Sequence, residues 1–439
     1  MIVLLGLLWP ALLGVLLARS LGRGLPAPMQ VFLSLPLGLG AISCSLFVQL
    51  ETGLPALVFE LLVALAAGAV CWRVGTPPCV KPAIKGSLDI WIGVGLAVTL
   101  AASLYRFRIV IFEAPQGAWD AWQIWNMHAR FLATPYWRDM FSSEIPWTHG
   151  DYPLLLPGSI ARLWSLTGRQ DLDASHLVAF LFTFATIGLL GSAVSALKGR
   201  AHGMLAALFL AATPFFIVQG ASQCADIPLS FFLLAVVALA AFEEGVLLAG
   251  LCAAMAAWTK NEGLLLVAVV APIRTLALCL SRGVRGASAP TVRFLAGLAP
   301  LLAIVLFMRF ALAPPNDHIG GRPLAALVSQ ATDFQRWKLV LLAVPRGIRR
   351  LGGLPVGVPV LLLIYGVLAG LEAKCDRLTL WTGSATLAAL LAGYCVVCVV
   401  QPRDIYWQID TALYRLLMQL WPAAIFLVFI AVRPLRPTA

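Results

Sequence analysis

The sequence is a succession of apolar runs, most of them about as long as a helix that crosses a membrane. The hydrocarbon core of a bilayer is about 30 Å thick, and about 20 apolar residues in a helix span it. The runs cover 2–18, 29–50, 54–72, 89–110, 174–197, 203–219, 227–242, 245–259, 263–281, 293–312, 353–371, 379–400 and 414–432. Since lipid cannot satisfy backbone polar groups, the runs must be helices. The sequence therefore predicts an all-α polytopic membrane protein with about thirteen transmembrane helices.

The charge content excludes a sizeable soluble domain. Only 12% of the residues are charged, against about 25% in ordinary soluble proteins. The net charge of +11 does not indicate a nucleic-acid partner, because no block of Lys and Arg gathers in the chain. The cysteines lie mostly within or beside apolar runs, where a thiol behaves as a small hydrophobic group. Membrane lipids are the expected surroundings, and no zinc site is indicated.

The flanks of the runs predict an orientation. Cytoplasmic loops carry an excess of Lys and Arg, and one set of loops is basic: Arg19 and Arg23; Arg73, Lys81 and Lys85; Lys198 and Arg200; Arg282, Arg285 and Arg293; Lys374 and Arg377; Arg433 and Arg436. With these inside, the N-terminus is outside and the C-terminus is cytoplasmic. The first run has neither a positive n-region nor an A-x-A site, so we expect a retained helix rather than a signal peptide.

Four segments then face outward: 111–173, 220–226, 313–352 and 401–413. We expect three parts of the chain: N-terminal transmembrane helices in 1–110, a long outer loop in 111–173, and a transmembrane core with short outer loops in 174–439. The long loop holds six tryptophans. Trp119, Trp122 and Trp125 recur at i, i+3 and i+6, which predicts a helix in the membrane interface with one aromatic face.

Asp120 is the first candidate for chemistry, and two interpretations of it are open. Asp120 followed three residues later by Gln123 resembles a capping box that starts a helix. A carboxylate at the membrane interface could equally act as a general base for a hydroxyl group.

A second polar group lies further along the same loop, in the segment His149-Gly-Asp-Tyr-Pro-Leu-Leu-Leu-Pro157. Its prolines predict a turn that re-enters the interface. His149 and Asp151 could be polar ends of this turn or could line a cavity with Asp120. They could also hold a metal ion, although their spacing is unspecific, so a divalent metal is possible but not indicated.

Charged residues also break the later apolar runs. Asp226-Ile-Pro228 is typical of a helix start. Lys260 and Glu262 could pair with each other, or Lys260 could bind a phosphate beside a cavity. Arg403 and Arg415 flank the fourth outer segment. Snorkelling toward the interface explains Arg403 more easily than Arg415, which lies where an apolar run begins.

Taken together, these motifs resemble the GT-C superfamily of membrane glycosyltransferases, close to the protein O-mannosyltransferases and the lipid-A aminoarabinose transferase. The resemblance rests on W-D-A-W-Q-I-W-N from Trp119, D-Y-P-L-L-L-P from Asp151, A-D-I-P-L-S-F-F from Ala225 and K-N-E-G from Lys260. The ending from Trp407 to Pro422 is also similar to that of bacterial members. The chain departs from the family in having three apolar runs, rather than one, before the helix that leads into the first outer loop.

The resemblance implies an inverting transfer of a sugar from a polyprenyl-phosphate-linked donor to a lipid, glycan or protein acceptor. It places the protein in the bacterial inner (cytoplasmic) membrane of the cell envelope, with the active site facing the periplasm. Asp120 would be the general base, and no cofactor would be required, because Lys and Arg can neutralise the departing phosphate. The candidate phosphate ligands are Lys260, Arg415 and Arg336. The expected substrate cavity is lined by Trp122, Asn126, His149, Asp151, Tyr152, Asp226, Glu262 and Arg403.

Two other classes of function are compatible with a chain of this kind. A transporter would also have about a dozen helices with polar residues near the midplane, but more often shows internal repeats, and none is evident here. A subunit for polysaccharide export or assembly would need no carboxylate at position 120.

Overall fold

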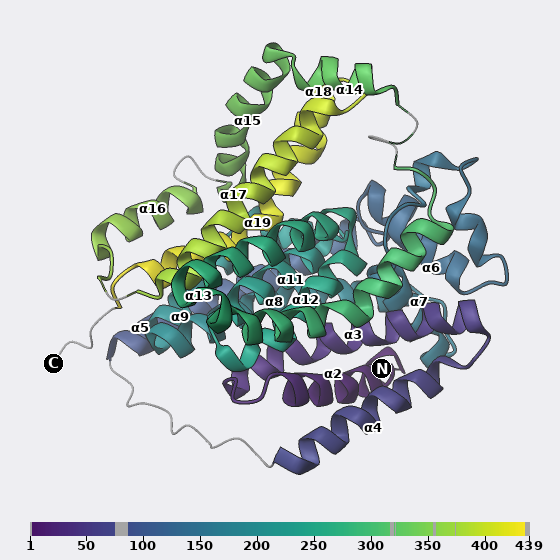
Figure 1. Cartoon of the computed structure of the whole chain (residues 1–439), viewed down its shortest axis with the longest axis horizontal. Coiled ribbons are helices and arrows are strands. Elements are labelled where there is room, and N and C mark those ends of the chain that lie inside the picture. The colour runs from purple at the N-terminus through teal and green to yellow at the C-terminus, as the bar shows by residue number, and fades with distance from the viewer. Residues whose placement is uncertain are drawn as a thin grey trace.

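The computed structural model is a bundle of helices (Figure 1), and 83% of it is helical. It describes residues 2–74, 87–316, 320, 322–353, 357–373 and 375–434. Within these ranges there is no β-strand, and Leu371 and Val432 form an isolated bridge. Four residues of the predicted basic flanks, Lys81, Lys85, Lys374 and Arg436, lie outside the described residues.

Eight helical segments of the described chain are long and apolar enough to cross a membrane. They are α1–α2 (Ile2–Gly6 and Leu8–Leu21), α3 (Ala27–Thr52), α4 (Ala56–Val74), α5 (Ser87–Glu113), α8 (Asp173–Lys198), α13 with η5 (Asn261–Phe307 and Met308–Leu312), α17 (Arg377–Val400) and α18–η6–α19 (Ile405–Gln408, Ile409–Leu413 and Tyr414–Ala431). The chain is therefore a helical protein of the multi-pass membrane class, as the apolar runs predict.

Several of the remaining apolar runs are not separate straight helices in the structure. The run 203–219 is a bent pair, α9 (Arg200–Ala211) and α10 (Pro214–Ala221), with an angle of 66° between the helices. The bend falls at Pro214, whose ring and missing N–H favour the start of a new helix. The runs 263–281 and 293–312 lie on one long helical segment, α13 continued by η5, in which α13 is broken by non-helical backbone at Gly283 (φ 72°, ψ 167°).

Two short helices form the centre of the bundle. α11 (Asp226–Leu239) and α12 (Val246–Thr259) have 14 residues each, which gives a length of about 21 Å at 1.5 Å per residue. Every residue of α11 is buried, and α11 packs against α8, α12 and α19 (Figure 1). Protein rather than lipid therefore surrounds α11, which explains why its sequence is apolar on all sides.

Glycines bring α12 and α13 into close contact. A Cβ added at Gly250 would lie 2.0 Å from the carbonyl oxygen of Phe294, and one at Gly297 would lie 1.9 Å from that of Leu247. Neither position has room for a side chain. Small residues at helix crossings allow the backbones to approach closely, and in membranes this packing replaces much of the hydrophobic driving force.

The segment between α5 and α8 contains η1 (Ala121–Trp125), α6 (Asn126–Leu132), η2 (Trp137–Phe141), η3 (Pro146–Thr148) and α7 (Leu155–Thr167). The prediction of one aromatic face is wrong. Trp119 and Trp122 are 53% and 44% exposed, whereas Trp125 is 1% exposed. The cause is that η1 is a π-helix, whose wider turn changes which residues share a face. The expected turn at Pro153 leads into α7, whose residues from Leu155 to Trp164 are all buried within the protein.

Residues that the sequence assigns to the same side of the membrane meet in the structure. At one end, Lys198 pairs with Glu372 and also donates to the carbonyl of Val432. Arg282 pairs with Glu243 at 3.1 Å. These segments all belong to the predicted cytoplasmic side. Residues of the predicted outer segments 111–173 and 220–226 meet at a separate group of charged residues. The sidedness of the loops stays a prediction.

Three helices lie at the edge of the bundle. α14 (Leu324–Ala331) has no buried residue, α15 (Phe334–Gly352) packs against α17 and α19, and α16 (Val358–Ala369) packs mainly against α15. Figure 1 shows α15 and α16 projecting from the main body.

Candidate functional site

A buried carboxylate organises the candidate site. Asp226, at the start of α11, has 0% exposure. Its Oδ1 accepts from Lys260 Nζ at 3.0 Å and from Gln419 Nε2 at 2.7 Å. Its Oδ2 accepts from Arg415 Nε at 3.0 Å and Nη2 at 2.8 Å, and from Gln219 Nε2 at 3.0 Å. A buried charge is tolerated when it is paired and fully hydrogen-bonded, and Asp226 meets both conditions.

The interpretation of Asp226 as a routine helix start is therefore incomplete. Asp226 does occupy the first turn of α11, but its side chain makes no capping hydrogen bond. It instead binds side chains from α10, α19 and the turn between α12 and α13.

Arg415 connects the buried carboxylate to a more accessible one. Its Nη1 lies 2.6 Å from Asp120 Oδ2, while Nε and Nη2 bind Asp226. The Asp120 side chain is 27% exposed and the Arg415 side chain is 21% exposed. Asp120 makes no capping hydrogen bond at the start of η1, so the structure does not contain the capping box. Arg415 faces two carboxylates, which explains an arginine within an apolar run better than snorkelling does.

Lys260 and Glu262 complete what we call the charge cluster: Asp120, Asp226, Lys260, Glu262 and Arg415. Lys260 Nζ lies 2.9 Å from Glu262 Oε1 as well as 3.0 Å from Asp226. Lys260 has extended backbone, with φ −161° and ψ 158°, between α12 and α13. This break in the helix turns the Lys260 side chain toward α11. The three carboxylates and two cations give the cluster a formal charge of −1.

A second polar group adjoins the charge cluster through the same turn. Asp151 is 1% exposed, and its Oδ2 accepts from Asn261 and Asn316, both at 2.7 Å. Arg309 Nη1 lies 3.6 Å from the same oxygen. The structure thus brings the His149–Pro157 segment against Lys260-Asn-Glu-Gly263, with Asn261 as the link.

Three stacked rings lie beside Asp151. Tyr152 stacks on Trp125 at 5.3 Å and on His149 at 5.0 Å, with interplanar angles of 10° and 12°. His149 adopts a left-handed conformation (φ 51°) that a non-glycine residue rarely uses. Burial raises the pKa of Tyr152 well above its usual range, and nearby Lys260 opposes this rise. The phenol therefore remains protonated and can act as a hydrogen-bond donor.

Four other predicted site residues make no hydrogen bond or ion pair with the charge cluster among the described residues. Asn126 donates to the carbonyl of Gln116 at 3.2 Å and to the side chain of Gln223 at 3.3 Å. Arg336 donates to the backbone carbonyls of Val399 and Gln401. Trp122 is 44% exposed. Arg403 is exposed, with its guanidinium 5.2 Å from the centre of the Trp407 ring.

Several residues of the site were not anticipated from the sequence. Gln219 and Gln419 bind Asp226, Asn261 and Asn316 bind Asp151, and Arg309 lies near Asp151. Four of these five are amides, which carry no charge and stand out little within apolar runs. Gln419 gave a weak signal, since a polar side chain in the middle of a membrane span usually faces the protein interior.

The site is polar, ionic and mostly enclosed. Three buried polar atoms near it, Asn126 Oδ1, Asn261 Oδ1 and Trp125 Nε1, have no hydrogen-bond partner among the described residues. Among the described residues, no group of three or more His, Cys, Asp or Glu side chains is arranged to hold a metal ion. Chemically, the cluster offers a carboxylate and a guanidinium at its accessible edge, whereas Lys260 is buried between Asp226 and Glu262.

The fold and the charge cluster together define a multi-pass membrane protein with a buried ionic centre that joins four segments distant in sequence. Comparison with protein-family models, curated proteins and solved structures found no match to this chain.

Proposed function

We propose that the protein transfers a sugar from a polyprenyl-phosphate donor to an acceptor hydroxyl, with inversion, and that Asp120 is the general base. The observation that carries the proposal is the Asp120–Arg415 pair, which puts a carboxylate and a guanidinium together at the accessible edge of the charge cluster. The resemblance in sequence motifs supplies the substrate class, and the arrangement of these side chains supplies the chemistry.

The proposed reaction makes one bond and breaks one. The acceptor oxygen attacks the anomeric carbon of the sugar, and its proton passes to the Asp120 carboxylate. The bond between the anomeric carbon and the phosphate oxygen breaks, and its electron pair leaves with the polyprenyl phosphate. Arg415 and Lys260 stabilise the developing phosphate charge, since donors placed where charge develops are among the most effective catalytic devices.

The Asp120–Arg415 pair also implies an order of events. In the structure Arg415 Nη1 is engaged by Asp120, whereas Nε and Nη2 are held by the buried Asp226. A donor phosphate would displace the partly exposed Asp120 rather than Asp226. The displaced carboxylate would then be free to accept a proton from the acceptor, so donor binding would precede activation of the base.

The proposal requires a particular topology. Thirteen crossings with the N-terminus outside would place Asp120, Asp151, Asp226, Lys260 and Arg415 on the outer side, together with interfacial helices in 111–173. The contacts among Asp120, Asp226, Lys260 and Arg415 support a common side for these four residues. Asp151 joins the same group through Asn261, the neighbour of Lys260. For a bacterial protein, this side would be the periplasmic face of the inner membrane.

Asp120→Asn is the direct test. The amide keeps the shape of the side chain but cannot take the proton, and general-base catalysis contributes about 10²–10⁴-fold. We expect transfer from purified polyprenyl-phosphate sugar to fall by at least about a hundredfold. Donor binding should be retained or become tighter, because residue 120, which competes with the donor phosphate for Arg415, loses its negative charge. The melting temperature should change little, since partly exposed ion pairs contribute about 0–1 kcal/mol.

Asp139→Asn is the matched control. Asp139 is an exposed carboxylate in the same outer segment, so its substitution removes the same charge from the same region. The Asp139→Asn variant should transfer sugar at the rate of the wild type. Near-wild-type turnover in Asp120→Asn would remove Asp120 from the mechanism. The absence of transfer in the wild-type protein, with donors differing in sugar, would instead favour the transporter or assembly classes.

A further inference from the structure

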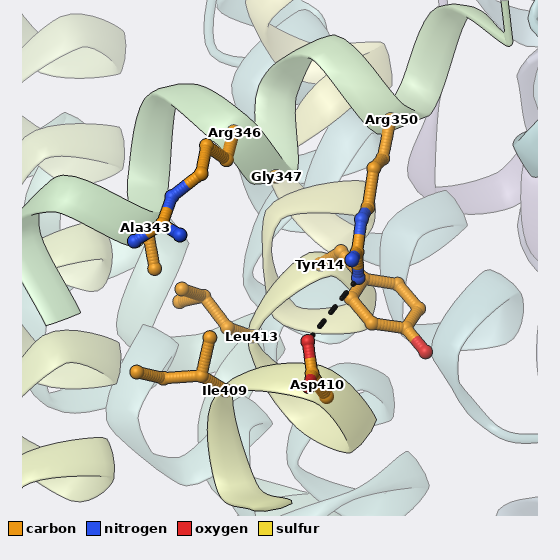
Figure 2. Close-up of a pocket in the computed structure, with 8 residues that line it drawn as sticks. All are labelled: Ala343, Arg346, Gly347, Arg350, Ile409, Asp410, Leu413 and Tyr414. Carbon is orange, nitrogen blue, oxygen red and sulfur yellow. Dashed lines mark hydrogen bonds and ion pairs between the residues drawn. The ribbon is translucent and has the colours of Figure 1, made fainter. Parts of the chain in front are cut away.

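A second candidate site lies between α15 and the beginning of α19, outside the charge cluster. A surface pocket there is lined by Ala343, Arg346, Gly347, Arg350, Ile409, Asp410, Leu413 and Tyr414. Figure 2 shows the side chains of Arg346 and Arg350 extending from α15 toward the η6 segment that carries Ile409, Asp410 and Leu413. The two arginines are four residues apart, which puts them on one face of the helix.

The guanidinium groups in this pocket make few polar contacts with the described residues. Arg346 Nε donates to the Leu342 carbonyl of its own helix at 3.1 Å. Its terminal nitrogens have no partner within the described parts of the chain. Arg350 Nη1 lies 3.5 Å from Asp410 Oδ1, and these two side chains are 59% and 67% exposed. Such an exposed pair contributes little stability, so an anion can replace Asp410 at Arg350.

The composition of α15 favours a lipid headgroup over a soluble anion. The helix carries five basic residues and no acidic one, namely Arg336, Lys338, Arg346, Arg349 and Arg350. It also exposes apolar side chains, with Leu341 at 55%, Leu342 at 54% and Ile348 at 37%. Helices that combine basic and exposed apolar residues bind at the surface of anionic membranes.

The level of the pocket in the bundle agrees with this assignment. The residues 409–414 belong to the first part of the candidate span Ile405–Ala431. Since they lie close to one end of a helix that crosses the membrane, the pocket lies near the boundary between headgroups and hydrocarbon. Arginine can bind a phosphate there with two parallel hydrogen bonds.

We propose that this pocket binds the phosphoester headgroup of an anionic membrane lipid, with Arg346 and Arg350 as the phosphate ligands. The Tyr414 ring closes one side of the pocket, with the Arg350 guanidinium 5.5 Å from its centre. The proposal is independent of the transfer reaction, because neither arginine belongs to the charge cluster.

The test uses the full-length protein in phosphatidylcholine nanodiscs that contain a minor fraction of phosphatidylglycerol. Native mass spectrometry measures how many phosphatidylglycerol molecules remain bound. For the double variant Arg346→Gln/Arg350→Gln, we expect the affinity for phosphatidylglycerol to fall by at least about tenfold, since two charge-assisted contacts are lost. The double variant Lys338→Gln/Arg349→Gln removes the same charge from α15 outside the pocket, and it should retain wild-type binding.

Three outcomes would overturn the proposal. Equal losses in both double variants would show a general attraction to basic charge rather than a site. Unchanged binding in Arg346→Gln/Arg350→Gln, with an unchanged melting temperature, would exclude the pocket. Saturable binding of inorganic phosphate that depends on the two arginines, without enrichment of phosphatidylglycerol, would show that the ligand is a soluble phosphoester.

Discussion

Asp226 shows how one residue can hold several distant parts of a membrane protein together. It accepts hydrogen bonds from Gln219, Lys260, Arg415 and Gln419 while fully buried. The free-energy cost of burying this carboxylate is offset only while its partners are present. Removal of its charge takes from Lys260 and Arg415 their fully buried partner and leaves each of them only a partly exposed carboxylate.

We therefore expect Asp226→Asn to be strongly destabilising. Breaking a buried ion pair by removing one partner typically costs about 3–5 kcal/mol. Unfolding in mixed micelles measures the difference from the wild type. Glu243→Gln is a suitable control because its pair with Arg282 is exposed, at 75% for Glu243 and 42% for Arg282, and its loss should cost less than about 1 kcal/mol. Equal stability of the two variants would contradict a structural role for Asp226.

His128 gives the protein a dependence of stability on pH. It is 0% exposed in α6, and burial lowers the pKa of His128 from 6.5 to about 4, with a further contribution from His149. Between these two pH values the unfolded chain binds a proton that the folded protein excludes. Stability therefore falls as the pH decreases from about 6.5 toward 4 and levels off below that range.

At pH 5 this effect amounts to about 2 kcal/mol relative to neutral pH. We expect His128→Gln to be less stable than the wild type at pH 7.5 but to lose less stability on acidification. Melting temperatures measured between pH 7.5 and 5 test this difference in slope. Parallel curves for the two proteins would show that His128 is not the titrating group.

Much of the site could be predicted from residue types, but its organisation could not. The sequence pointed to Asp120, Asp226, Lys260, Glu262 and Arg415, and the structure brings all five together. It gave no reason to rank Asp226 above the others, because Asp before Ile-Pro is an ordinary helix start. Pairing between segments depends on three-dimensional packing, which local pattern does not determine.

At the scale of helices, the break in α13 depends on a single glycine. Gly283 has φ 72° and ψ 167°, and a Cβ added there would meet nothing within 4 Å. A substitution is therefore opposed by backbone conformation alone. This region of φ and ψ is essentially restricted to glycine, and strain of this kind costs about 1–3 kcal/mol.

Gly283→Ala should destabilise the protein by about this amount. Gly95→Ala in α5 is the matched control, since this glycine is helical and also has open space around it. Alanine is favoured over glycine within a helix by about 0.5–1 kcal/mol, so the control should be neutral or slightly stabilised. The two variants are compared by thermal unfolding in the same detergent. An unchanged Gly283→Ala variant would show that the break is not fixed by this glycine.

The apolar runs predicted most long helices but not the changes within them. Length and hydropathy locate α3, α5, α8 and α17 to within a few residues. They do not show whether a helix bends, as at Pro214, or whether a turn is a π-helix, as in η1. The short, fully buried α11 was predicted as one more transmembrane helix, because hydropathy does not distinguish lipid from protein as the surrounding medium.

For the whole molecule, the sidedness of the loops remains a prediction about the cell. A cysteine at Ser143, which is exposed in the segment between α5 and α8, should react with a membrane-impermeant maleimide in intact spheroplasts of a cysteine-free background. A cysteine at Ser288, exposed at the other end of the bundle, should react only after permeabilisation. The reverse pattern would invert the topology and place the charge cluster on the cytoplasmic side.

The convergence of distant segments on Asp226 has a consequence for the synthesis of the protein. Lys260 follows Asp226 by 34 residues, whereas Arg415 and Gln419 follow it by 189 and 193 residues. At about 5–20 residues per second, translation separates Asp226 from Arg415 by roughly 10–40 s. During this interval the carboxylate is already in the nascent chain without two of its final partners. Insertion of α19 therefore completes the ionic centre, and the central helices cannot reach their final packing until translation has passed Gln419.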